Sequence, residues 1–156
     1  MKKVFATLML AALITGCSAF VRAPEHIDKG DRIVCVLYKQ SEFKDSVIKS
    51  LTETLADRGY RVIADSYRKA KYYPASDFAA VVYMADYWAW HTPLHAKKYY
   101  RRNHGAVNIV VVVTSGDPDV TITEPFDAIT GPSKEERVGP VADEILRRIE
   151  PVLKIR

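Results

Sequence analysis

Three histidines lie close together in the sequence and are the residues best suited to binding a metal ion. His91 and His95 follow Asp86 with the spacing HxxxH, which would place both imidazoles on one face of a helix, and His104 comes later. Pro93 stands between the first two and follows a strand-like stretch, so a helix across both positions is not expected. The sequence has no HExxH motif and no closely spaced cysteine pair. We therefore expect loop histidines and no metal site.

Motifs for acyl transfer and for nucleotide binding are missing from the sequence. It contains no GxSxG, no GxGxxG and no GxxxxGK[ST]. Asp117 and Asp119 flank Pro118 and are explained as turn-forming residues. We therefore expect no catalytic residue, no cofactor and no enzymatic activity.

Cys35 is the only cysteine besides Cys17. Its neighbours form an apolar run typical of a buried strand, where a free cysteine behaves as a small hydrophobic residue. An intermolecular disulfide is the alternative in an oxidising compartment.

Aromatic and basic residues occur together in the middle of the chain. Eight of the nine tyrosines and both tryptophans lie between Tyr60 and Tyr100, interleaved with lysine and arginine. Tyrosine, tryptophan and arginine are enriched at protein interfaces because they offer large contact areas with a polar end. The candidate binding surface consists of Trp88, Trp90, Lys97, Lys98, Tyr99, Tyr100, Arg101 and Arg102. The alternative is that the aromatic residues are strand formers in a half-buried sheet and that the cations are solvated in loops.

The first seventeen residues have the pattern of a lipoprotein signal. Two lysines precede an uncharged run at 4–14, which is too short to span a bilayer, and Ile14-Thr15-Gly16-Cys17 resembles a bacterial lipobox. The resemblance implies lipidation of Cys17 and anchoring in a membrane. Because Ser18 follows the cysteine, the resemblance favours the outer membrane. We expect the domain to face the periplasm.

The domain organisation follows from this signal. Residues 1–16 are expected to be a signal peptide, 17–30 a lipidated tether and 31–156 a single domain. Without the two lysines of the signal, the formal charge falls from +4 to +2. A nearly neutral, lipid-anchored envelope protein has little access to nucleic acid, so we expect no nucleic-acid partner.

The periodicity of the chain predicts the elements that position these residues. We expect a βαβ unit with parallel strands in the first half of the domain. It consists of an apolar strand at 32–38, a helix capped by Ser41 and stopped by Gly59, and a strand at 60–64. In this helix Lys44 is expected to point away from the core.

The second half of the chain predicts three more strands and a final helix. The strands are expected at 78–90, 106–114 and 120–124, and the helix at 140–150. The order β-α-β-β-β-β-α suggests an α+β two-layer sandwich, with a mixed sheet of about five strands and two helices on one face.

Several short segments occur together in this chain: the lipobox, Val34-Cys35-Val36, Arg58-Gly59-Tyr60-Arg61-Val62, Trp88-x-Trp90 and Phe126-Asp127-Ala128. Their combination resembles a family of small uncharacterised lipoproteins of Gram-negative bacteria and, more distantly, accessory envelope lipoproteins. The resemblance implies a non-enzymatic interaction or accessory module with an envelope protein as partner. The alternatives are a binder of lipopolysaccharide phosphate or peptidoglycan and, less favoured, a His-dependent metalloenzyme.

Overall fold

Five parallel strands form one sheet at the centre of the domain. The computed structural model describes residues 21–88 and 91–153. The strands are β1 (Gly30–Tyr38), β2 (Arg61–Ser66), β3 (Phe78–Asp86), β4 (Ile109–Ser115) and β5 (Ile129–Pro132), and their order in the sheet is β2-β1-β3-β4-β5. Each strand runs parallel to its neighbours, so every connection must cross over a face of the sheet.

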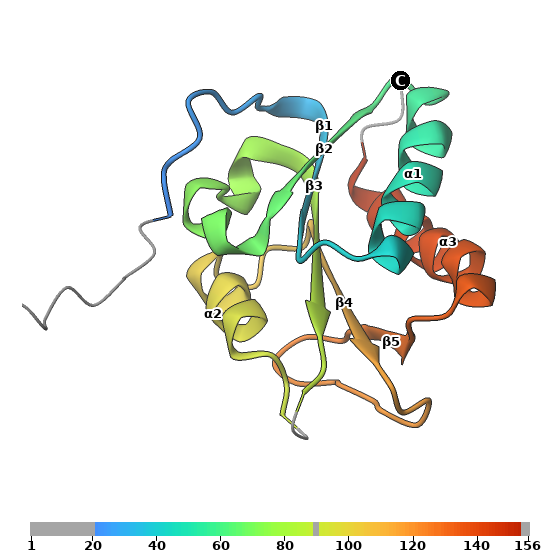
Figure 1. Ribbon diagram of the computed structural model, residues 1–156. Coiled ribbons are helices and arrows are strands. Elements are labelled where there is room, and N and C mark those ends of the chain that lie inside the picture. The colour runs from blue at the N-terminus through green and yellow to red at the C-terminus, as the bar shows by residue number, and fades with distance from the viewer. Residues whose placement is uncertain (1–20, 89–90, 154–156) are drawn as a thin grey trace, which may run out of the picture.

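Helices cover both faces of this sheet (Figure 1). The helices α1 (Glu42–Ala56) and α3 (Val138–Ile149) pack on one face. The helix α2 (Leu94–Arg102) and the 3₁₀ helix η1 (Tyr67–Tyr72) lie on the other. Short 3₁₀ turns η2 (Ala75–Asp77), η3 (Glu135–Arg137) and η4 (Glu150–Val152) complete the connections. The architecture is a three-layer α/β sandwich.

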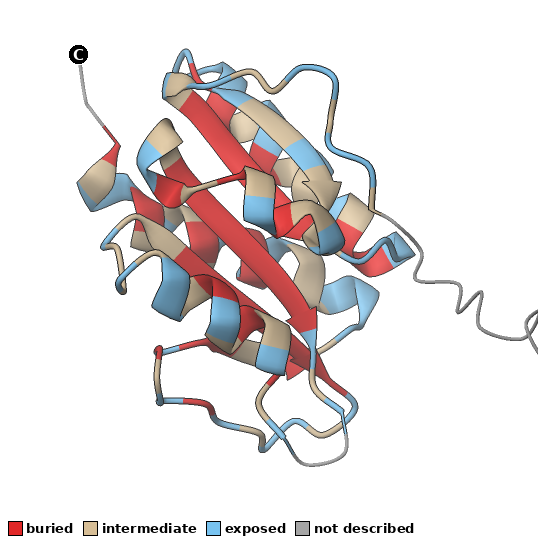
Figure 2. Ribbon diagram, turned by 90° about the vertical axis from the view of Figure 1, so that its left-hand side faces the viewer, coloured by how far each residue is buried: buried red, intermediate tan, exposed pale blue. Residues whose placement is uncertain are grey.

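The predicted α+β class, with a mixed two-layer sheet and helices on one face only, is therefore wrong. The reason lies in β3, where Ala80 through Ala85 are all apolar and nearly inaccessible to solvent. Val82 and Met84 pack toward α1 and α3, whereas Val81 and Tyr83 pack toward α2 and η1. A strand without a polar face requires cover on both sides. Figure 2, which views the α2 and η1 side, shows that the central strands β1, β3 and β4 are buried along most of their length.

The first βαβ unit forms as the sequence predicts. The Ser41 side chain caps α1 by accepting a hydrogen bond from the backbone N–H of Lys44 at 3.4 Å. Val47 and Leu51 lie on the fully buried face of the helix. Gly59, with a φ of 73°, then turns the chain into β2. Cys35 is also buried as predicted, and burial raises the pKa of its thiol.

Three elements of the second half differ from the prediction. The strand expected at 78–90 ends at Asp86, and Pro93 precedes the unexpected helix α2, because proline is compatible with a helix start. The expected strand at 120–124 is irregular, and the fifth strand is instead β5, where no strand was expected. With a helix between β3 and β4, those two strands become parallel.

The predicted signal peptide at 1–16 and the lipidated Cys17 lie outside the described residues. Residues 21–29 contain no helix or strand and lead into β1. In the described part of the chain, no helix is both long enough and apolar enough to cross a membrane.

Candidate functional site

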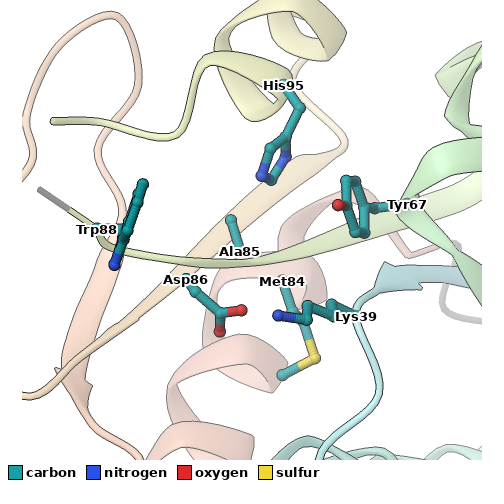
Figure 3. A pocket seen from close by; sticks show the side chains of 7 residues that line it. All are labelled: Lys39, Tyr67, Met84, Ala85, Asp86, Trp88 and His95. Carbon is teal, nitrogen blue, oxygen red and sulfur yellow. The ribbon is translucent and has the colours of Figure 1, made fainter.

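A pocket of about 420 Å³ opens where the strands β1 and β3 end. Figure 3 shows His95 pointing from α2 toward β3, with Tyr67 and Trp88 on opposite sides of the strand end. Seven residues line the pocket, namely Lys39, Tyr67, Met84, Ala85, Asp86, Trp88 and His95.

The strand order explains why a pocket forms at this place. After β1 the chain crosses one face of the sheet through α1 to reach β2. After β3 it crosses the opposite face through α2 to reach β4. The two connections diverge at the carboxyl ends of adjacent strands, and the space between them is the usual ligand site of an open parallel sheet.

One wall of the pocket carries an ion pair between α1 and β3. The Lys44 ammonium donates to the Asp86 carboxylate, which also accepts a hydrogen bond from the Thr114 hydroxyl at 3.1 Å. The Lys44 side chain is 1% exposed, whereas that of Asp86 is 46% exposed. Burial raises the pKa of Asp86, but hydrogen bonds from Lys44 and Thr114 and the charges of Lys44 and Lys39 together hold it below its ordinary value.

The opposite wall of the pocket is aromatic. The ring centroids of Tyr67 and His95 are 4.5 Å apart, and the Tyr83 hydroxyl lies 3.1 Å from Nδ1 of His95. Burial lowers the pKa of His95, which favours the neutral form of its imidazole. Trp88 is 84% exposed at the mouth. Together these rings provide flat, uncharged surfaces around the pocket.

The residues of the predicted aromatic and basic surface do not form one surface in the structure. Tyr99 is buried, and its hydroxyl donates to the backbone carbonyl of Tyr73 at 2.7 Å. Tyr100 packs edge-on against Phe126 with a centroid distance of 5.4 Å. Trp88 belongs to the pocket mouth instead. The cations Lys97, Lys98, Arg101 and Arg102 lie along α2 at partly buried or exposed positions, and Trp90 lies outside the described residues.

The three histidines do not share one site. His91 precedes α2, His95 points from this helix into the pocket, and His104 follows the helix with a φ of 54°. No group of three or more His, Cys, Asp or Glu residues able to hold a metal ion is found in residues 21–88 and 91–153. His95, which the sequence placed in a loop, is therefore a pocket residue on a helix.

The sequence reasoning missed Lys39, Lys44 and Tyr67. Lys44 was predicted to point away from the core, but it is buried. Its spacing to Val47 and Leu51 places it on the inner side of α1, and this was the signal that could have revealed it. Asp86 carried a similar signal, because it follows Val82 and Met84 at every second position of a strand. No local pattern marked Lys39 or Tyr67, which the topology brings together.

No protein-family model and no curated protein matches the chain. Among solved structures, flavodoxin 2 from Bacillus cereus gives a TM-score of 0.52 at 10% identity, covering 77% of this chain and 99% of that one. A flavodoxin from the domain Archaea gives 0.51 at 10% identity, with coverages of 77% and 97%. The rubredoxin oxygen:oxidoreductase of Desulfovibrio gigas gives 0.51 at 13% identity and covers 81% of this chain, which spans only 38% of that protein.

The fold is flavodoxin-like. This finding corrects the resemblance to small Gram-negative lipoproteins and to accessory envelope lipoproteins. It also corrects the interpretations as an accessory module, as a binder of lipopolysaccharide phosphate or peptidoglycan, and as a metalloenzyme. In this fold the ligand site lies at the carboxyl edge of the sheet, not on an outer helix surface. The likeness extends to the fold alone, so Cys17 lipidation, an outer-membrane location and the lack of enzymatic activity stay predictions.

In flavodoxins, flavin mononucleotide lies at the junction that corresponds to the ends of β1 and β3. Its phosphate would require free backbone N–H groups at the start of α1. The connection Lys39–Ser41 contains no glycine, and the Ser41 side chain already accepts the N–H of Lys44. Glu42 and Asp45 place two carboxylates in the first helical turn, where they would repel a phosphate. The residues of this chain therefore do not fit the phosphate end of the cofactor, although the aromatic wall fits a ring.

Proposed function

We propose that the pocket binds the planar ring of a flavin without a phosphate anchor. The observation that carries the proposal is the pocket at the β1 and β3 strand ends, with Tyr67, Trp88 and His95 around it. Its volume of about 420 Å³ lies within the range of small-molecule sites. The flavodoxin-like fold supports the same position for a flavin ring.

Each wall has chemistry that suits such a ring. Tyr67 and Trp88 offer aromatic faces, and stacking on such faces contributes about 1–3 kcal/mol for a flat heterocycle. A neutral His95 can present a ring nitrogen to the polar edge of the ligand. Lys39 brings a positive charge to the opposite side of the pocket. A bound flavin would supply electron transfer, and the chain's residues supply the stacking surfaces and the charge beside it.

Tryptophan fluorescence reports on the pocket, because Trp88 lines it and the only other tryptophan of the chain is Trp90. Riboflavin and flavin mononucleotide are titrated separately against the chain, following the fluorescence of both protein and flavin. We expect flavin mononucleotide to bind no more tightly than riboflavin, since the phosphate finds no favourable site and would meet Glu42 and Asp45. Flavin mononucleotide binding more than tenfold tighter than riboflavin would contradict the proposed binding mode.

Two substitutions in η1 distinguish an effect on the pocket from a general effect on this helix. Tyr67→Ala removes a ring that lines the pocket and should weaken riboflavin binding about tenfold or more. Tyr72→Ala, the matched control, removes a ring of the same helix that does not line the pocket and should leave affinity unchanged. Equal effects of the two substitutions, or no riboflavin binding to the unchanged chain, would show that the proposal is wrong.

A further inference from the structure

The two helical layers differ sharply in charge. The elements α2 and η1 together contain seven lysines and arginines and no aspartate or glutamate. The opposite layer, α1 and α3, contains acidic and basic residues together. Two neighbouring helices that carry only basic charged residues are suited to an anionic surface.

The two basic elements form one continuous surface. The Arg102 guanidinium donates to the backbone carbonyl of Ala70 in η1 and lies over the ring of Tyr99 at 5.6 Å. Lys98 and Arg101 of α2 are exposed, as are Arg68 and Lys71 of η1. Figures 1 and 2 both show α2 and η1 on the same side of the sheet. We call these two elements the basic face.

The start of the described chain lies on this same side. The Tyr72 hydroxyl of η1 donates to the backbone carbonyl of Val21 at 3.4 Å. Cys17, the predicted lipidation site, is four residues earlier, and four extended residues reach at most ~14 Å. A lipid on Cys17 would therefore enter a bilayer close to the basic face.

Apolar side chains also project at the start of α2. Leu94 is 63% exposed, and Trp88, just before the helix, is 84% exposed. Tryptophan and leucine beside a row of cations are typical of helices that lie in the interface of a membrane.

We propose that the basic face lies on the surface of an anionic phospholipid bilayer, held there by the predicted lipid on Cys17. Lys98, Arg101, Arg68 and Lys71 contact the phosphate headgroups, and Leu94 enters the interface at the start of α2. This orientation leaves α1 and α3 toward the solvent. The proposal is independent of what the pocket binds.

The test uses residues 17–156, which contain every described element, with a maleimide lipid coupled to Cys17. Cys35 is buried and does not compete for the reagent. The lipid-bearing chain is inserted into vesicles of phosphatidylcholine alone or mixed with phosphatidylglycerol, both containing a brominated phosphatidylcholine. Quenching of tryptophan fluorescence by bromine then measures the approach of the Trp88 loop to the bilayer.

We expect stronger quenching in the vesicles with phosphatidylglycerol, and its loss in concentrated salt. Each cation close to an anionic surface strengthens binding by about fivefold, so Lys98→Glu with Arg101→Glu should abolish the difference between the two vesicles. The matched control is Lys49→Glu with Lys134→Glu, which changes charge equally at exposed positions outside the basic face and should have no effect. Far-UV circular dichroism verifies that each variant is folded.

Three results would overturn the proposal. The first is equal quenching in both kinds of vesicle, which would mean that charge does not orient the domain. The second is the same loss in the control pair as in the pair on α2. The third is no quenching in either vesicle, which would leave the basic face to a protein partner.

Discussion

The ion pair between Lys44 and Asp86 predicts an unequal response to removing its two members. The Lys44 side chain is 1% exposed, whereas that of Asp86 is 46% exposed at the pocket. Asp86→Asn would leave a buried ammonium without its counter-charge. Lys44→Met would leave a carboxylate that still reaches solvent and the Thr114 hydroxyl.

The magnitudes follow from the cost of burying an unpaired charge. Breaking a buried pair by removing one partner costs about 3–5 kcal/mol when the other charge stays buried. We expect this cost for Asp86→Asn, which is a large share of a typical free energy of unfolding of about 5–15 kcal/mol. Lys44→Met should cost about 1 kcal/mol or less, because a well-packed apolar side chain often replaces a buried charge without loss. The double variant should resemble Lys44→Met alone, so the two effects are not additive.

Urea unfolding at pH 7, followed by circular dichroism, measures all four proteins, and the slope of free energy against urea checks that the folded state is unchanged. Acid provides a second test. The lowered pKa of Asp86 means that its stabilisation is present above the ordinary carboxyl pKa of 3.8 and is lost as pH falls through the folded value. Wild type and Asp86→Asn should therefore converge in strong acid. Equal costs for the two single substitutions at pH 7 would refute the reasoning.

Three further predictions concern other parts of the fold. Hydrogen bonds from Arg147 lower the pKa of Glu144 from 4.5 to about 2, so Glu144→Gln should cost about 0.5–1 kcal/mol in urea unfolding at pH 7, and the difference should fade as pH drops from 4.5 to 2. Gly59→Ala should cost about 1 kcal/mol in the same assay from its positive φ alone, since no atom lies within 4 Å of the added Cβ; no loss would contradict this. Cys35 should react with a thiol reagent only after unfolding, because burial raises its pKa, and rapid labelling of the folded chain would show otherwise.

The sequence predicted those parts of the fold that local patterns determine. The cap at Ser41, the apolar stripe of α1 and the turn at Gly59 each act within a few residues, and all three are as expected. The prediction of two layers was wrong because it depended on a single element, the helix α2. Because Pro93 was taken to exclude a helix across His91 and His95, α2 was not predicted, and the second face of the sheet was left without a covering helix.

The candidate site was less predictable, because its residues come together only through the strand order. Lys39 follows β1, Tyr67 follows β2 and His95 belongs to α2. No spacing in the sequence links three positions so far apart. The aromatic and basic enrichment was visible, but it combined residues of different kinds: Tyr99 is part of the core, whereas Trp88 lies at the pocket.

The two ends of a flavodoxin-like ligand site are formed by different segments, and this chain separates them. Tyr67, Trp88 and His95 would provide the ring end, whereas the start of α1 would provide the phosphate end. Glu42 and Asp45 at that helix start interact favourably with the helix dipole and stabilise α1. The same carboxylates place negative charge where a phosphate would have to bind. Stability of α1 and phosphate binding therefore compete for one helix end, and these residues favour stability, which is why the phosphate ester should bind no more tightly than riboflavin.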